Sequence, residues 1–273
     1  MRVRGAIALF AFAIVANIVT ARAQYETPRP LPATTSLPDL RRQAIARAAA
    51  ERFHVGLEAL ANHDWARARA EFDATVAMNP PEPEGSSAWY DLALAQSHLG
   101  DNIGAAQSLH RAIALDPGFL AAMANLVAVD LASGDLKDAR TTADRFVAAA
   151  PESARALYSR GLVALQTNDY STARSDFSKL LRSDPQYAVA HYDLGLAESK
   201  SGNYPDALRE FTMAVQIAPA YARARFALGT ILLRTGDRGG ARAAFDRAAQ
   251  DATDDAGLRE LAIQLRDAIA APH

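Results

Sequence analysis

The sequence predicts an all-α protein: a right-handed superhelical solenoid of six helix-turn-helix repeats that ends in a capping helix. Prolines recur at positions 80, 117, 151, 185 and 219, at intervals of 37, 34, 34 and 34 residues. Small residues recur in register with these prolines, and so does an Asp or Asn. A fixed period of this size indicates stacked supersecondary units, because one such unit cannot bury its apolar face alone.

Two columns of small residues indicate where the helices of each unit meet. We count positions backward from the recurring proline, a slot that Thr253 fills in the sixth unit, and call the residues at one distance a column. The column at distance 12 is alanine in every unit: Ala68, Ala105, Ala139, Ala173, Ala207 and Ala241. The column at distance 24 contains Gly56, Ala93, Val127, Gly161, Gly195 and Gly229. Small side chains in both columns would let two helices approach closely.

Larger apolar residues fill the column at distance 8, which contains Phe72, Leu109, Ala143, Phe177, Phe211 and Phe245. The third unit is the exception, because it has Ala143 at distance 8 and Phe146 at distance 5. Most other units have the large residue first and a small one second. We interpret this as a volume-conserving exchange between neighbouring core positions, which protein cores tolerate.

A recurring pair of turn residues separates the two helices of each unit. The column at distance 16 contains Asp64, Asp101, Asp135, Asp169, Asn203 and Asp237, and these residue types are preferred helix N-caps. The column at distance 17 contains His63, Gly100, Gly134, Asn168, Gly202 and Gly236. Gly and Asn suit the left-handed position just past a helix end. Each proline then ends the second helix, because the residue before a proline is displaced from the helical region.

These units resemble tetratricopeptide repeats. The fit is best in residues 188–221, which carry Leu194, Gly195, Gly202, Tyr204, Ala207, Phe211, Ala214 and Pro219. The predicted repeats cover about 49–82, 86–119, 120–153, 154–187, 188–221 and 222–254, within an array from 39 to 254. The departures are local: His63 replaces the turn glycine, Val127 is large for its column, and the sixth unit lacks its proline.

Three segments complete the array. Residues 39–61 predict one long helix that extends the first unit, and residues 255–273 predict a capping helix with a polar outer face. Residues 80–85 add three residues to the period between the first two repeats. This insertion is either a hinge or a longer loop.

The N-terminus has the pattern of an export signal. Arg2 and Arg4 precede an apolar stretch, and the small-x-small triplet Ala21-Arg22-Ala23 predicts cleavage between Ala23 and Gln24. The alternative is an uncleaved anchor helix. We therefore expect a signal peptide at 1–23, a proline-rich linker at 24–38, no membrane span after cleavage, and a periplasmic location. Frequent arginine with three lysines is typical of a GC-rich bacterial genome.

Composition argues against several classes of function. The chain has no cysteine, which excludes disulfides and thiolate metal sites. The formal net charge is −2, and 26 basic against 31 acidic residues would remain after cleavage, which argues against nucleic-acid binding. No two of the six histidines form a helical zinc pair with a glutamate, and no Gly-x-Ser-x-Gly motif occurs. We expect no enzyme, no metal and no cofactor, and we expect His191 to be a core residue.

A second apolar stripe on the first helices is the candidate binding site. The columns at distances 27, 23 and 20 lie on one helix face and are mostly apolar or tyrosine. In the resembled family this face lines a concave groove that holds partner peptides. The candidate residues, with two arginines on the rim, are Phe53, Tyr90, Leu94, Leu131, Arg155, Tyr158, Leu162, Leu165, Tyr192, Leu196, Arg223 and Phe226. The alternative is that these columns serve packing between repeats and nothing else.

The type of peptide can be narrowed. One subset of the family clamps a C-terminal carboxylate with basic and amide side chains. Here Asn125 and Arg155 match that pattern, whereas Tyr90, Leu94 and Ser159 do not. We therefore expect a non-catalytic exported scaffold that binds a protein or peptide through apolar and aromatic side chains, with Tyr158 and Tyr192 near the centre. The alternatives are a self-assembling structural protein or a subunit of an envelope enzyme complex.

Overall fold

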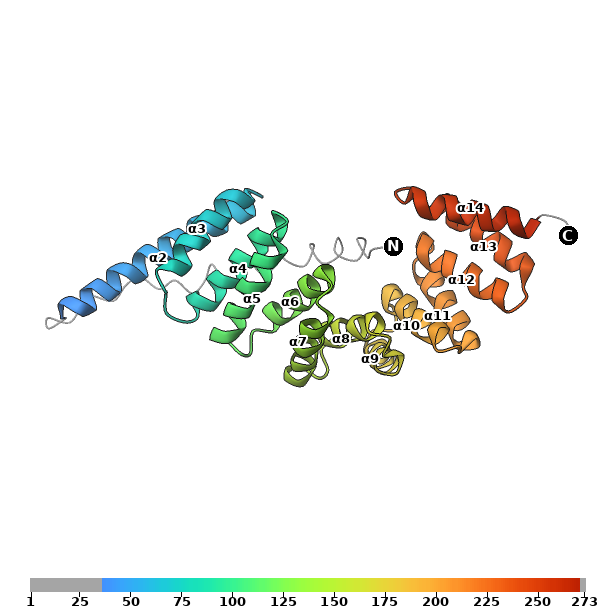
Figure 1. The fold of residues 1–273 in the computed structure, drawn as a ribbon, viewed down its shortest axis with the longest axis horizontal. Coiled ribbons are helices and arrows are strands. Elements are labelled where there is room, and N and C mark those ends of the chain that lie inside the picture. Colours follow the sequence, from blue (N-terminus) through green and yellow to red (C-terminus); the bar gives the residue numbers. More distant parts are fainter. Residues whose placement is uncertain (1–35, 271–273) are drawn as a thin grey trace. The chain divides into compact units, whose positions relative to one another are not determined.

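The computed structural model describes residues 36–270, and all thirteen regular elements in that part of the chain are α-helices (Figure 1). The helices are α2 (Leu37–Ala61), α3 (Trp65–Ala77), α4 (Glu84–His98), α5 (Asn102–Leu115), α6 (Leu120–Ser133), α7 (Leu136–Ala149), α8 (Ala154–Gln166), α9 (Tyr170–Ser183), α10 (Ala188–Lys200), α11 (Tyr204–Ile217), α12 (Ala222–Arg234), α13 (Arg238–Asp251) and α14 (Ala256–Ala270). The predicted signal peptide and residues 24–35 of the predicted linker lie outside the described residues.

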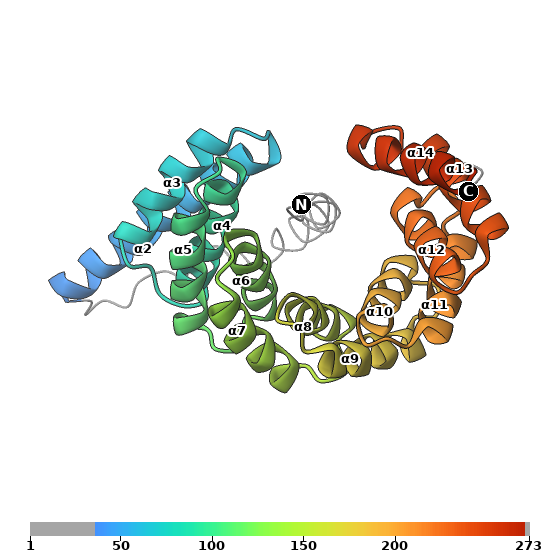
Figure 2. The same cartoon turned by 45° about the vertical axis from the view of Figure 1, so that its right-hand side comes forward.

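The chain divides into two compact units, one ending at Thr142 and the other beginning at Ala143, within α7. In the N-terminal unit, the hairpins α2/α3 and α4/α5 pack on each other, and α5 packs on α6. In the C-terminal unit, the hairpins α8/α9, α10/α11 and α12/α13 follow in order, and α14 covers α13. Within each unit, hairpins stack side by side (Figure 2). Each unit is therefore a stack of helical hairpins, as the repeat predicts.

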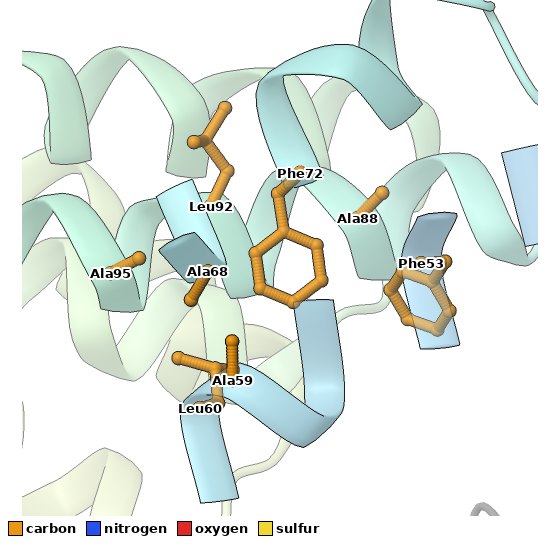
Figure 3. Close-up of a cluster of buried hydrophobic side chains, with 8 residues drawn as sticks. All are labelled: Phe53, Ala59, Leu60, Ala68, Phe72, Ala88, Leu92 and Ala95. Carbon is orange, nitrogen blue, oxygen red and sulfur yellow. The ribbon is translucent and has the colours of Figure 1, made fainter. Parts of the chain in front are cut away.

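The glycines at distance 24 face phenylalanine rings, and the alanines at distance 12 are buried, as predicted for positions where two helices approach closely. All six alanines at distance 12 are fully buried. A Cβ atom added to Gly161 would lie 2.6 Å from Cε1 of Phe177, and one added to Gly195 would lie 2.7 Å from Cε1 of Phe211. Such distances are too short for real contacts, so the glycines create the space that the phenylalanine rings fill. Figure 3 shows the cluster around Phe72, to which α2 and α3 of the first hairpin and α4 of the second contribute.

The turns between paired helices also follow the prediction, with one exception. All six residues at distance 17 have φ between 58° and 96°, including the non-glycines His63 and Asn168. Five of the six aspartate or asparagine side chains accept a hydrogen bond from the backbone N–H three residues later. Asn203 does not, so its predicted capping role is wrong. Its side-chain amide instead donates to Glu198 Oε2 at 2.8 Å, because a buried carboxylate lies within reach.

The edges of the array are close to the predicted ones. Helix α2 begins at Leu37, so Pro38 belongs to its first turn and not to the linker; a proline is tolerated there because its missing N–H would have no helical partner. Ser36 caps this helix through the backbone N–H of Asp39. Helix α14 buries Leu258 and Ala262 and leaves Leu261 exposed, as expected of a capping helix. Helix α4 begins at Glu84, two residues before the predicted repeat boundary.

None of the helices among the described residues is both long enough and apolar enough to cross a membrane. The predicted signal stretch lies before residue 36, outside the described residues.

Candidate functional site

The first helices of neighbouring repeats touch, so their inner columns form common surfaces. In the C-terminal unit, α8 contacts α10 and α10 contacts α12, and Figures 1 and 2 both show these three helices side by side. In the N-terminal unit, α2 contacts α4. We call the surface made by α8, α10 and α12 the inner surface of the C-terminal unit. It carries eight of the twelve predicted site residues.

Burial separates the predicted site residues into two groups. On the inner surface, six are half-buried or exposed and so reach solvent: Arg155, Leu162, Leu165, Leu196, Arg223 and Phe226. Tyr192 is half-buried as well, whereas Tyr158 is 5% exposed. In the N-terminal unit, Tyr90 and Leu131 are half-buried, and Phe53 and Leu94 are buried. Phe53 belongs to the core cluster around Phe72.

Tyr158 packs between two repeats. Its hydroxyl donates to Asp193 Oδ2 at 2.9 Å, and its ring lies 5.5 Å from the ring of Tyr187, centroid to centroid. The next repeat covers the ring of Tyr158, so this residue packs between repeats. Its contact with a partner, like those of the other site residues, stays a prediction.

Tyr90 occupies the same column in the N-terminal unit and makes an analogous link. Asn125 donates from Nδ2 to the Tyr90 hydroxyl at 3.1 Å, and the Tyr90 ring lies 5.0 Å from that of Phe119. In both units the linked residues are 35 positions apart, one column apart in successive repeats. Asn125, one of the two matches to the carboxylate-clamp pattern, thus has a structural contact of its own.

Tyr192 differs from the other two tyrosines of its column. The residue 35 positions later is Ala227, which has no polar group, and the structure gives the Tyr192 hydroxyl no hydrogen bond to any described residue. Its ring lies 5.2 Å from that of Tyr221 and 5.9 Å from that of Phe211. Burial and the neighbouring Asp193 raise the pKa of Tyr192 to about 12. The hydroxyl is therefore a neutral donor that a bound partner could use.

Asp193 is a site residue that the sequence reasoning missed. It is 6% exposed, and burial raises the pKa of its carboxyl to about 7. The signal was present in the column at distance 26, which reads His54, Asp91, Asn125, Ser159, Asp193 and Ala227. Polar residues in five of six repeats, beside a mostly apolar column, mark a position where polar groups have a role. Burial also raises the pKa of Asp91 to about 7.

The two predicted rim arginines have different surroundings. Arg223 lies near the start of α12 with a side chain that is 47% exposed, and its Nη2 is 3.2 Å from Asp255 Oδ2. The backbone N–H of Leu258 and Arg223 together lower the pKa of Asp255. Arg155 is half-buried near the start of α8. Neither arginine is ion-paired with Asp193.

Five of the six histidines, all except His273, lie among the described residues 36–270. His191 is buried, and its Nδ1 lies 2.7 Å from Glu210 Oε2, which confirms a core position. Within that range, no group of three or more His, Asp or Glu side chains has a geometry that could hold a metal ion. The His–Glu pair therefore links α10 to α11 as part of the core.

Stacked hairpins with a recurring aromatic and a polar inner column define a helical-repeat protein of the tetratricopeptide type. The family description that matches the chain is Tetratricopeptide repeat, over residues 56–118, 126–188 and 192–256. These matches cover well over half of the chain, and the chain belongs to the tetratricopeptide repeat family. No curated protein sequence is significantly similar to it.

Solved structures resemble the fold at low sequence identity. PilW, described as a widely conserved type IV pilus biogenesis factor, has a TM-score of 0.66 and 16% identity, over 79% of this chain and 98% of PilW. YrrB, described as having an unusual peptide-binding site, has a TM-score of 0.57 and 18% identity, over 72% of this chain and 97% of YrrB. MamA from Desulfovibrio magneticus RS-1 has a TM-score of 0.58 and 19% identity, over 63% and 97%. At these identities the likeness shows the fold.

Proposed function

We propose that this chain is a non-catalytic, exported scaffold that binds a segment of a partner polypeptide on the inner surface of its C-terminal unit. The observation that carries the proposal is the row of half-buried apolar side chains on three touching helices. Leu162 and Leu165 lie on α8, Leu196 on α10 and Phe226 on α12. Contiguous apolar surface of this kind on a soluble protein marks interaction sites.

The polar groups of the inner surface suit a peptide backbone. Tyr192 offers a hydroxyl that no described residue engages, beside apolar neighbours that exclude water. A tyrosine in such a place buries a large area at low entropic cost and keeps one polar contact. YrrB, with the same type of fold, is described as having a peptide-binding site, which supports this use of the fold.

The test is a pull-down of the partner with the full chain, in which the C-terminal unit is left intact. The double variant Leu162→Gln, Leu196→Gln should lose the captured partner while keeping the helical circular dichroism and melting temperature within a few degrees. Leu261→Gln is the matched control, because it makes the same change at an exposed leucine of the capping helix α14. Equal capture by the double variant and the control would contradict the proposal.

Export rests on residues outside the described part of the chain. The Ala21-Arg22-Ala23 triplet motivates cleavage before Gln24. Intact-mass measurement on protein from the envelope fraction should show a chain that starts at Gln24. A mass that still includes Met1 to Ala23 would make the protein a membrane-anchored one.

Self-assembly is the second candidate function, and one observation favours it. The first turns of α2 expose Leu37, Leu40 and Ile45, at 82%, 40% and 40% of their surface. Exposed apolar side chains on a helix end are typical of a contact with another chain. Mass measured by light scattering over a range of concentrations should rise if this is the main function, and Leu40→Glu should abolish the rise.

A further inference from the structure

Four tyrosines gather around the buried carboxylate of Asp193. Tyr158 comes from α8, Tyr187 and Tyr221 precede the first turns of α10 and α12, and Tyr192 is next to Asp193 in α10. The rings form two pairs, Tyr158 with Tyr187 at 5.5 Å and Tyr192 with Tyr221 at 5.2 Å. The negative charge of Asp193 raises the pKa of all four phenols, after burial itself, which places every phenol near the carboxylate.

Asp193 has less compensation than the other buried acids of the C-terminal unit. Asp176 lies 2.7 Å from Arg160, and Glu198 lies 2.7 Å from Arg174. Asp193 receives one hydrogen bond, from the Tyr158 hydroxyl, and the structure shows no ion pair for it among the described residues. A buried carboxylate is strongly unfavourable unless a cation or several hydrogen-bond donors face it.

Arg223, a cation in the first turn of α12, is engaged elsewhere. Arg223 lies close enough to lower the pKa of Tyr192 and Tyr221, but its guanidinium pairs with Asp255 at 3.2 Å. Among residues 36–270, the Asp193 carboxylate therefore has aromatic rings around it beneath the inner surface and no cation paired with it. Aromatic rings attract cations through their negative faces, and a carboxylate adds a full charge at the same place.

We propose that Asp193, with the rings of Tyr187, Tyr192 and Tyr221, binds a cationic side chain, lysine or arginine, of the partner polypeptide. This inference rests on the proposed function and names the chemistry that the inner surface selects. Charge favours it as well, since acidic residues outnumber basic ones in the chain and attract a basic partner. The competing reading is that Asp193 serves Tyr158 alone, as Asn125 serves Tyr90.

The N-terminal unit provides a matched control. Asp91 occupies the same column, and burial also raises the pKa of its carboxyl to about 7. In the repeat before Asp91, the position that corresponds to Tyr158 is Phe53. Phe53 has no hydroxyl and cannot donate a hydrogen bond to Asp91. Asp91 therefore has a raised pKa like that of Asp193, although its side chain is only partly buried, and it lacks the partner hydroxyl that Tyr158 gives Asp193. A general effect of charge would appear at both positions, whereas a cation site of this kind requires Asp193.

The experiment is a selection of random twelve-residue peptides against the full mature chain, its Asp193→Asn variant and its Asp91→Asn variant. Peptides that bind the unchanged chain and the Asp91→Asn variant should share a basic residue at one fixed position of the peptide, with apolar residues at neighbouring positions. Binders to Asp193→Asn should keep the apolar places and lose the basic one. A resynthesised binder with norleucine in place of its lysine should bind the unchanged chain at least about tenfold more weakly, and Asp193→Asn equally well.

The pH dependence gives a second readout. The phenols near Asp193 are those of Tyr158, Tyr187, Tyr192 and Tyr221, and burial and the charge of Asp193 raise the pKa of all four. The nearby Arg223 pairs with Asp255. Because only the ionised carboxylate attracts the cation, affinity for the lysine peptide should rise about tenfold between pH 6 and pH 8. The norleucine peptide should show no such rise.

Three results would overturn the inference. A basic place that Asp193→Asn retains, or that Asp91→Asn also loses, would show that general charge attraction selects it. Binders without any basic place would leave the peptide-binding proposal standing and assign Asp193 to Tyr158 alone. The absence of binders to every chain would remove both proposals. Should Asp193→Asn lose its helical circular dichroism, Asp193→Ser replaces it, since Ser159 fills the same column one repeat earlier.

Discussion

Two buried acids, one in each compact unit, differ in how the surrounding residues compensate their charge. In the C-terminal unit, Asp176 is 2% exposed and receives two hydrogen bonds from Arg160, at 2.7 and 2.8 Å. In the N-terminal unit, Asp130 is 4% exposed, and its Oδ2 has no hydrogen-bond partner. Burial and the nearby Asp138 and Asp135 raise the pKa of Asp130 to about 7. The same backbone frame thus tolerates an acid either as a paired anion or as a neutral carboxyl.

Residues in neighbouring columns explain why Asp130 lacks the partners that another buried acid of the C-terminal unit, Glu198, has. Glu198 stands at distance 21 in the fifth repeat and has Arg174 and Asn203 as partners. Asp130 stands at distance 21 in the third repeat, but the residues equivalent to those partners are Ala106 and Asp135. Neither can donate a side-chain hydrogen bond to a carboxylate. A repeat column therefore fixes where a side chain points, and the neighbouring columns decide which charge it can carry.

The largest expected effect is in the paired acid. Arg160→Ala should lower the free energy of unfolding by about 3 kcal/mol, because it leaves the Asp176 carboxylate buried without its cation. The matched change Arg52→Ala in the N-terminal unit removes an ion pair whose arginine is 48% exposed, and should cost less than about 1 kcal/mol. Urea unfolding followed by circular dichroism measures both. Equal effects would mean that the Asp176 pair is no stronger than a surface pair.

The next effect tests what the units share. Ala173→Leu and Ala105→Leu both overpack a fully buried position of the alanine column, and each should cost about 1–3 kcal/mol. The methyl groups of Ala173 and Ala105 are 0% exposed between closely packed helices, so a leucine side chain has no space there. Thermal unfolding measures the loss. An unchanged melting temperature for either variant would contradict the assigned packing, and a large difference between them would show that the two frames are packed differently.

Asp130→Asn should stabilise the protein by about 1–2 kcal/mol above pH 7. The folded carboxyl has a pKa above that of the unfolded chain, so folding binds a proton between about pH 4 and 7. Stability from this group therefore falls as pH rises through that range, and the uncharged amide avoids the loss. The advantage of the variant should shrink toward pH 4. Asp176→Asn is the control and should destabilise, since it weakens the contact with Arg160.

The smallest effect concerns the turns. Asp101→Ala removes a cap on the backbone N–H of Gly104 at 2.9 Å and should cost about 1 kcal/mol. Asn203→Ala removes no cap, and Glu198 keeps Arg174 at 2.7 Å, so the loss should stay within about 0.5 kcal/mol. Denaturant midpoints compare the two. A larger loss at Asn203 would mean that its bond to Glu198 matters more than a cap.

The fold could be read from the sequence because each element of the repeat has its own local signal. Alanine at distance 12, a left-handed residue at distance 17 and a cap at distance 16 act within one hairpin. The inner surface was less predictable. Whether Tyr158 faces solvent depends on Asp193 in the next repeat and on the ring of Tyr187, and a list of columns does not contain such contacts. Asp193 is not evident from the apolar columns, because it lies in the polar column beside them.

The 35-residue spacing of the bond between Tyr158 and Asp193 has a mechanical consequence. The contacts between repeats reach no further than the adjacent hairpin. The chain therefore closes no long loop when it folds, and no contact between distant residues resists a pulling force. A load applied to the ends of the C-terminal unit would release hairpins one after another, each at a similar force. The C-terminal unit would therefore lengthen in steps under tension, and it would refold hairpin by hairpin without having to form a knot or a contact between distant residues.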